Sequence, residues 1–185
     1  MNRCHITDRR PLGGVVPLLE VIARNDAAGV DLIQIREKDL PLRELSALVR
    51  DAVAACRHAR VLVNTRVDVA LACRAAGAHL PAGSPPPSAW RPITPPGFLI
   101  GVSCHDIDEL VQAGREGADY ALFSPVFRPL SKQDDRPLHG LDGLRRACAA
   151  VTIPVYALGG VTAENSALCL QAGAAGVAGI TLFQS

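Results

Sequence analysis

Aromatic residues are rare in this chain, and its net charge is close to zero. Phe, Trp and Tyr make up 4% of its 185 residues, and the formal net charge at pH 7 is +1. Proteins that bind single-stranded nucleic acid stack bases on aromatic rings, and nucleic-acid binders in general carry a basic surface. The composition therefore argues against a nucleic-acid partner.

Long hydrophobic runs and paired cysteines are missing as well. No apolar run reaches the roughly 20 residues that a membrane-spanning helix needs, and the opening MNRCHITDRR lacks the apolar core of a signal peptide. The six cysteines form no C-x-x-C pair, and several fall inside apolar patterns, which is typical of reduced core thiols. We therefore expect a cytoplasmic protein with no membrane partner and no zinc or disulfide framework.

The chain is rich in short apolar runs that alternate with helical patterns. Its hydrophobic fraction of 49% suits one well-packed domain over residues 1–185. Apolar residues spaced three and four apart predict helices between the runs, and several helices end in a glycine that opens the turn into the next strand. The predicted strands cover residues 4–8, 31–36, 60–64, 78–81, 98–104, 119–125, 154–160 and 176–183.

Repeated strand–helix units predict a parallel sheet, and eight of them favour a closed (β/α)₈ barrel, the TIM barrel. An open doubly wound sheet is the rival, but no G-x-G-x-x-G motif follows the first strand. The barrel would be compact, because the proline-rich segment 84–97 cannot form a full fourth helix and the last helix is missing. The apolar surface left at the first and last units would suit a homodimer.

The stretch LIQIREKDL, residues 32–40, places an amide and two cations at alternate positions. Alternate residues of a strand share one face, so Gln34, Arg36 and Lys38 would point the same way. Burying two cations without anionic partners is costly, so a bound anion such as a phosphate is the simplest explanation. The alternative is a structural salt bridge in which Glu37 or Asp39 turns back.

Other polar residues fall at the ends of the remaining predicted strands. In a (β/α)₈ barrel these carboxyl ends share one face, where active sites lie. The diglycine after strand seven and the residues after strand eight form a second candidate anion site, because exposed backbone N–H groups bind phosphate there. The candidates are Asn64, Ser103, His105, Ser131, Lys132, Gly159, Gly160, Ile180 and Thr181.

His105 is the acid/base candidate of this set. It follows the fifth strand, beside Cys104, at the same face as the other candidates. Histidine titrates near neutral pH and often serves as a general acid or base. A purely structural histidine is the alternative that the sequence leaves open.

Read in order, these segments resemble the thiamine-phosphate synthase/TenI family of (β/α)₈ barrels. HITD resembles the family's first strand, QIREK its Q-x-R-x-K signature and VNTRVDVAL its segment after strand three. GVSCHD, ADYALFSPVF, PVYALGGVTAEN and AGAAGVAGIT follow in the family's order, so the resemblance covers nearly the whole chain.

The resemblance implies a role for each candidate. Gln34, Arg36, Lys38, Asn64, Ser103 and Lys132 would hold an aminopyrimidine diphosphate, and Ser131, Gly159, Gly160, Ile180 and Thr181 would hold a thiazole phosphate. A synthase would join the two ligands and release pyrophosphate. The implied catalytic residues are Arg36 and Lys132, which would stabilise the departing charge, and His105.

The chain departs from the family's pattern at three positions. Thr65 and Ser84 stand where the synthases carry two Mg²⁺-binding aspartates, so Mg²⁺ would bind only through the substrate diphosphate. Pro125 stands where the TenI branch carries its catalytic histidine. The resemblance therefore leaves open a synthase-like enzyme, a TenI-like thiazole tautomerase and a non-catalytic binder of thiazole or thiamine phosphate.

Overall fold

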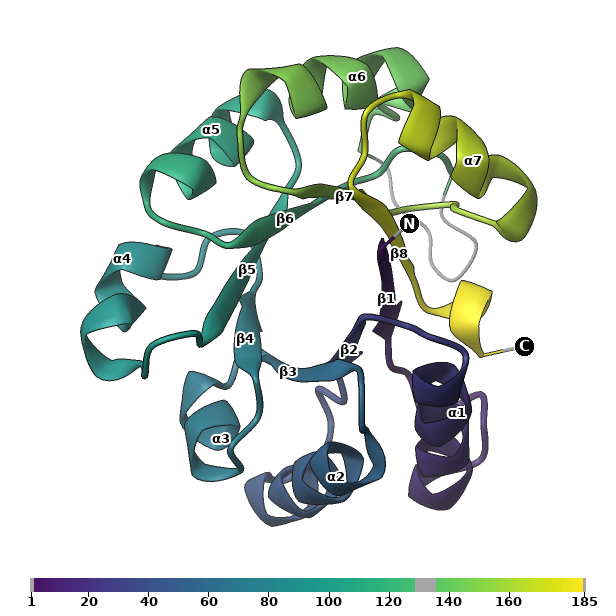
Figure 1. Ribbon diagram of the computed structural model, residues 1–185, viewed down its shortest axis with the longest axis vertical. Coiled ribbons are helices and arrows are strands. Elements are labelled where there is room, and N and C mark those ends of the chain that lie inside the picture. Colours follow the sequence, from purple (N-terminus) through teal and green to yellow (C-terminus); the bar gives the residue numbers. More distant parts are fainter. Residues whose placement is uncertain (1, 129–135, 185) are drawn as a thin grey trace.

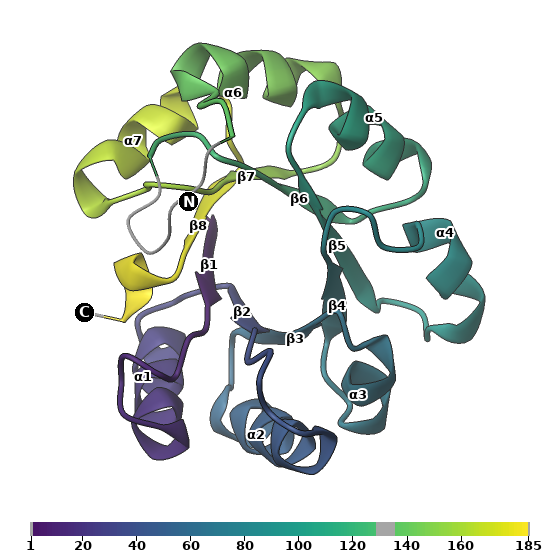
Figure 2. The same ribbon diagram turned by 180° about the vertical axis from the view of Figure 1, so that it is seen from behind.

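The computed structural model describes residues 2–128 and 136–184, and in this part of the chain eight parallel strands close into a barrel. Each strand pairs with the next, and β8 pairs with β1, while the helices surround the barrel (Figure 1, and from behind Figure 2). The predicted (β/α)₈ fold is confirmed. The strands are β1 (Asn2–Ile6), β2 (Leu32–Ile35), β3 (Arg60–Asn64), β4 (Gly77–Leu80), β5 (Leu99–Cys104), β6 (Tyr120–Phe123), β7 (Val155–Ala157) and β8 (Gly176–Gly179).

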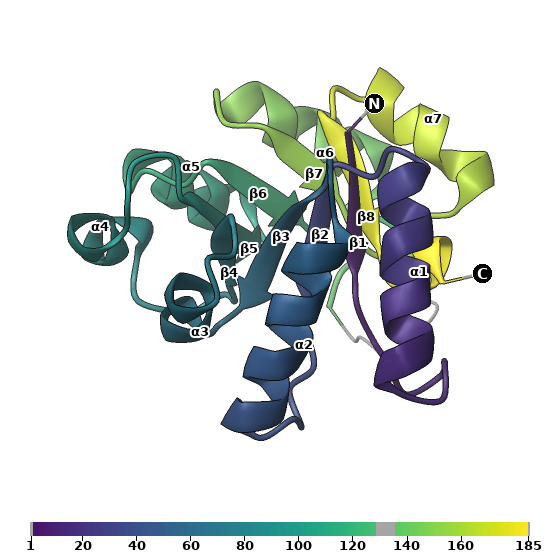
Figure 3. The ribbon, with the colours of Figure 1, turned by 60° about the horizontal axis from the view of Figure 1, so that its bottom comes forward.

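The fourth helical position is reduced, as predicted, and a short turn follows the last strand. α4 (Pro87–Trp90) is a single turn that continues as the 3-10 turn η1 (Arg91–Ile93), and β8 leads into a second 3-10 turn, η2 (Thr181–Phe183). Figure 3 shows the contrast between short α4 and the longer α1 and α2 beside the strands. The other helices are α1 (Val15–Ala27), α2 (Leu42–Ala55), α3 (Val67–Ala72), α5 (Ile107–Arg115), α6 (Gly140–Ala150) and α7 (Ala163–Gln171).

Two features of the helices relate to the predicted membrane and dimer contacts. No helix within the described ranges is long and apolar enough to cross a membrane. Val16 on α1 and Leu168 on α7 are large apolar side chains that remain exposed. They lie in the first and last helices, where a homodimer was predicted, and this pairing stays a prediction.

Several strands end earlier than their apolar runs predict. β2 ends at Ile35 and β7 at Ala157, although the predicted runs extend to residues 36 and 160. Pairing of β2 with β3 stops at Ile35, and pairing of β7 with β8 stops at Ala157. The polar residues that follow have no ladder partner, so they enter the loops that form one mouth of the barrel.

The apolar core lies in two shells, one on each side of the barrel wall. Two clusters of buried aliphatic side chains join the outer face of the strands to the helices. A third cluster fills the inside of the barrel and consists of Cys4, Ile6, Leu32, Leu62, Tyr120, Leu122, Tyr156 and Ala178. The strands are therefore covered on both faces, as parallel strands require.

Two tyrosines occupy the inside of the barrel because a strand glycine leaves space for one of them. The rings of Tyr120 and Tyr156 meet edge to face, with centroids 5.5 Å apart. A Cβ atom built on Gly101 would overlap the Tyr120 ring. Gly101 is therefore required by close packing rather than by an unusual backbone angle.

A buried carboxylate anchors the loop between α2 and β3. Asp26, which is 5% exposed, accepts hydrogen bonds from the backbone N–H groups of Arg57, His58 and Ala59 at 2.6 to 3.0 Å. Burial acts to raise the pKa of Asp26, but these three hydrogen bonds outweigh it, so the pKa lies below its usual value. The charged carboxylate thus accepts the hydrogen bonds of three backbone N–H groups in this loop.

Replacing Gly101 by Ala should destabilise the protein by about 3 kcal/mol, because the new methyl group forces Tyr120 out of its position. Gly114→Ala is the matched control. A Cβ at Gly114 would touch only Ile153, at 3.9 Å, so this change should stabilise α5 by about 0.5–1 kcal/mol. Urea unfolding measures both, and equal effects at the two positions would contradict the packing argument.

Replacing Asp26 by Asn should cost about 2 kcal/mol at pH 7, since the amide offers one acceptor oxygen where the carboxylate offers two. The folded-state pKa is depressed, so the carboxylate stabilises the fold above its unfolded pKa of about 4 and loses this effect as the pH falls through the folded value. Urea unfolding from pH 7 to pH 3 should show the two proteins converging. A difference that does not change with pH would contradict the assignment.

Candidate functional site

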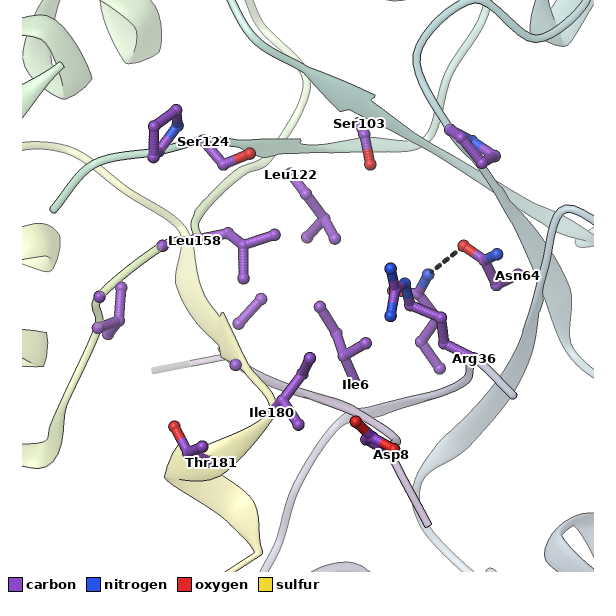
Figure 4. A pocket seen from close by; sticks show the side chains of 18 of the residues that line it. Ile6, Asp8, Arg36, Asn64, Ser103, Leu122, Ser124, Leu158, Ile180 and Thr181 are labelled. Atoms are coloured by element: carbon purple, nitrogen blue, oxygen red, sulfur yellow. Dashed lines mark hydrogen bonds between the residues drawn. The ribbon is translucent and has the colours of Figure 1, made fainter. Parts of the chain in front are cut away.

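The carboxyl ends of the strands surround a cavity of about 440 Å³, a size typical of small-ligand sites. All the candidates that fall within the described residues line it, and Figure 4 shows several of them around the opening. Ser131 and Lys132 lie outside the described residues. The candidates that line the cavity are Gln34, Arg36, Lys38, Asn64, Ser103, His105, Gly159, Gly160, Ile180 and Thr181.

The acidic residues of the REKD segment bind Arg9 instead of Arg36. The buried Glu37 carboxylate accepts from the Thr7 hydroxyl at 2.6 Å and from the Arg9 guanidinium at 3.0 Å, and Asp39 holds the same guanidinium through two bonds. The Arg9 hydrogen bonds lower the pKa of Asp39 to about 2. The interpretation in which Glu37 or Asp39 neutralises Arg36 is therefore wrong.

The same contacts hold the loop after β2 against the loop after β1. The Arg36 backbone N–H donates to the Thr7 hydroxyl at 2.9 Å, and that hydroxyl donates to Glu37. Arg9 closes the arrangement from the other side through its backbone N–H and its side chain. The backbone of Arg36 is thus held in place while its side chain lies at the cavity, as Figure 4 shows.

Three charged residues at the mouth were not predicted from the sequence. Asp8 and Arg10, which follow β1, and Arg136 also line the cavity. Asp8 adds a carboxylate to a mouth for which only basic and uncharged candidates were predicted. The signal was present in the segment TDRR directly after the first strand.

The carboxylate at the mouth does not cancel its positive charge. Arg10 binds both oxygens of Asp8, at 2.9 and 3.0 Å. The Arg10 hydrogen bond lowers the pKa of Asp8, and the nearby Arg36 lowers it further. The described residues that line the cavity thus include four basic side chains, Arg10, Arg36, Lys38 and Arg136, and one acidic side chain, Asp8, a composition that favours an anionic ligand.

Uncharged polar side chains from β2, β3 and β5 also line the cavity, beside apolar ones such as Ile6 and Leu122. The Gln34 amide donates to Asn64 Oδ1 at 3.0 Å, whereas Gln34 Oε1 is buried and has no hydrogen-bond partner among the described residues. Ser103 contributes a hydroxyl that bonds the buried His79 at 2.8 Å. A buried acceptor without a partner is costly, so Gln34 Oε1 suits a ligand that donates a hydrogen bond.

His105 is held in one tautomer. Its Nδ1 lies 2.8 Å from the Ser124 carbonyl oxygen, which can only accept, so Nδ1 carries the proton. Nε2 is then the ring nitrogen that can exchange a proton with a ligand. Cys104, its neighbour, is buried, and burial raises the pKa of its thiol to about 12, so it is not a thiolate nucleophile at neutral pH.

The diglycine and the segment after β8 form another part of the cavity wall. Gly159 and Gly160 have positive φ angles of 93° and 62°, and a Cβ at either would overlap the segment after β6. Glycine is therefore needed here for the packing of two loops. Ile180 and Thr181 lie across the cavity from Asn64 (Figure 4).

The positions of the two missing aspartates do not offer a magnesium site. Thr65 accepts a hydrogen bond from the Asn64 amide, and Ser84 borders a separate cavity of about 160 Å³ beside α5. Among the described residues, no group of three or more His, Cys, Asp or Glu side chains is arranged to hold a metal ion. Mg²⁺ prefers carboxylate and phosphate oxygens, so the residues present do not fit it.

Comparison with known proteins gives one consistent result. A family model described as thiamine monophosphate synthase matches residues 4–183. The thiamine-phosphate synthase of Methanoculleus marisnigri is 45% identical over 157 residues, which cover 84% of this chain and 74% of that protein. The thiamine-phosphate synthase of Moorella thermoacetica is 41% identical over 172 residues, or 92% and 82% of the two chains.

A solved structure matches the fold along the whole chain. It is a thiamine phosphate pyrophosphorylase from Pyrococcus furiosus, with 33% sequence identity and a TM-score of 0.87. The match covers 100% of this chain and 88% of the other.

Ligand-free protein should show no saturable response to Mg²⁺, because the Asp8 carboxylate is bound by Arg10 and the other described mouth residues offer no second acid. Thermal melting with Mg²⁺ and, separately, with inorganic pyrophosphate makes the comparison. Pyrophosphate should raise the Tm with or without the metal. A saturable rise in Tm with Mg²⁺ alone would contradict this account of the site.

Proposed function

Because this chain belongs to the thiamine-phosphate synthase/TenI family, which serves thiamine biosynthesis, we propose that it joins an aminopyrimidine diphosphate to a thiazole phosphate. The observation that carries this proposal is a cavity lined by both basic side chains and uncharged polar ones. A diphosphate joined to a neutral heterocycle has the matching distribution of charge.

The two ligands would occupy different parts of the mouth. Arg36 and Lys38 bind the diphosphate, and Gln34, Asn64 and Ser103 bind the pyrimidine ring. The thiazole phosphate lies at the opposite wall, against the backbone of Gly159, Gly160, Ile180 and Thr181. The predicted contributions of Ser131 and Lys132 belong to the same scheme.

The joining step needs charge stabilisation more than proton transfer. The bond between the pyrimidine methylene carbon and the diphosphate oxygen breaks, and pyrophosphate leaves with the electron pair. The thiazole nitrogen forms the new bond with its own lone pair, so no base is required. Arg36 stabilises the departing charge together with Lys132, and Arg10 and Arg136 add to the positive field.

A second candidate is a metal-free protein that binds thiazole phosphate or isomerises its ring. The mouth has no pair of carboxylates for Mg²⁺ among the described residues, and His105, held through Nδ1 by the Ser124 carbonyl, offers Nε2 as a candidate base. Isomerisation moves a proton and therefore needs such a base. His105 is the catalytic residue of this candidate, whereas the joining step does not use it.

Phosphorus NMR separates the two candidates. Protein mixed with aminopyrimidine diphosphate, thiazole phosphate and Mg²⁺ should release pyrophosphate and form thiamine phosphate. Mg²⁺ enters here only with the substrate diphosphate. Absence of turnover, with the thiazole phosphate resonance still broadened by binding, would reject the synthase and support the second candidate.

Replacing Arg36 by Gln should lower kcat/KM of the joining reaction by about 100-fold, because it removes a charge that faces the leaving group. Arg115→Gln is the matched control, since Arg115 is an exposed arginine at the end of α5. Steady-state assays of pyrophosphate release should find the control within about twofold of wild type. Equal activity of the two variants would reject the assigned role of Arg36.

A further inference from the structure

A chain of three hydrogen-bonded side chains runs from the inside of the barrel to the mouth. The Tyr120 hydroxyl lies 3.0 Å from His79 Nδ1, and His79 Nε2 lies 2.8 Å from the Ser103 hydroxyl. Tyr120 and His79 are 3% and 1% exposed, and only Ser103 lines the cavity. The three residues come from the neighbouring strands β4, β5 and β6, so the barrel wall itself holds the chain together.

The hydrogens of this chain can be placed from donor and acceptor chemistry. His79 is the hydrogen-bond partner of the buried Tyr120 hydroxyl among the described residues, so Tyr120 donates to Nδ1. A neutral imidazole then carries its hydrogen on Nε2, which donates to Ser103 Oγ. The Ser103 hydroxyl oxygen then accepts a hydrogen bond from His79, so the hydroxyl hydrogen can be donated to a ligand in the cavity.

His79 stays neutral, so the direction of donation from Tyr120 through His79 to Ser103 does not change with protonation of the ring. Burial lowers the pKa of His79 to about 3, and the positive charge of Arg36 lowers it further. The Tyr120 ring is in turn held by close packing against Gly101. The hydrogen-bond partner of His79 Nδ1 is therefore fixed.

We propose that His79, set by Tyr120, is a positioning residue that makes Ser103 a hydrogen-bond donor and so gives the cavity a fixed donor–acceptor polarity. Ser103 donates, and the unpartnered Gln34 Oε1 accepts. The matching ligand edge has a ring nitrogen that accepts beside an amino group that donates. This inference rests on the proposed function and names how its pyrimidine is selected.

The polarity discriminates between two pyrimidines of nearly equal size. In a 4-aminopyrimidine the exocyclic group donates and the ring nitrogen accepts. In the 4-oxo analogue the exocyclic oxygen accepts and the ring N–H donates, so both pairings with Ser103 and Gln34 are reversed. A site built to pair one pattern rejects the other strongly, because its buried polar groups are left unpaired.

The tautomer of His79 in ligand-free protein is the first test. Two-bond ¹H–¹⁵N correlation spectra show which ring nitrogen carries the hydrogen, and loss of one ring signal in His79→Gln assigns it. We expect the hydrogen on Nε2 in wild type and a mixture of tautomers in Tyr120→Phe. A hydrogen on Nδ1 in wild type would overturn the inference, whatever the enzyme does.

Ligand affinity is the second test. Tyr120→Phe keeps the ring that packs on Gly101 and should weaken binding of the 4-aminopyrimidine diphosphate by about tenfold, with little effect on inorganic pyrophosphate. In a Ser103→Ala background the same change should have no further effect. Tyr156→Phe, which removes the hydroxyl of the other interior tyrosine, is the matched control and should bind as wild type does.

The outcomes separate this inference from the proposed function. Additive losses from Tyr120→Phe and Ser103→Ala, or equal losses for pyrophosphate, would overturn the positioning role. If wild-type protein bound the 4-oxopyrimidine diphosphate as tightly as the 4-aminopyrimidine diphosphate, the proposed donor–acceptor polarity would be wrong. Wild type that binds neither pyrimidine would reject the proposed function and the ligand assignment, while the tautomer spectrum still decides the role of His79.

Discussion

The packing of Tyr120 against Gly101 is the contact on which the site depends. A small barrel has little internal volume, and a large ring fits only because the paired residue on the adjacent strand β5 is a glycine. The same ring carries the hydroxyl that orients His79, and His79 binds Ser103 at the mouth. Core packing therefore controls both the stability of the wall and the hydrogen-bonding pattern that a ligand meets.

Ion pairs at the mouth hold the loops that carry basic side chains to the cavity. Arg9 forms ion pairs with Glu37 and Asp39, and Arg10 forms one with Asp8. These pairs fix the loops after β1 and β2, which carry Arg36 and Lys38 to the cavity. The loops are thus stabilised by ion pairs, while the basic side chains suit the phosphates of the proposed ligands.

The elements of the fold could be predicted because their signals are local. Apolar runs, helical spacing and glycine-containing turns need only neighbouring residues, and the proline-rich segment 84–97 excludes a long helix wherever it lies. Strand ends were predicted less well. β2 and β7 stop where pairing with both neighbours stops, and that depends on register between distant segments. Asp8 was missed although it stands at the end of the predicted first strand, a position that places a residue at the mouth of the barrel.

The sequence by itself determined the order of strands and helices, and hence which residues follow each strand. Closure of the barrel then places those residues at one end, because the carboxyl ends of parallel strands all lie on the same side. Only the tertiary structure decided which charges are paired and that His79 lies within hydrogen-bond distance of both Tyr120 and Ser103. Those outcomes depend on distances of a few ångströms between residues far apart in the chain, and no local pattern encodes them.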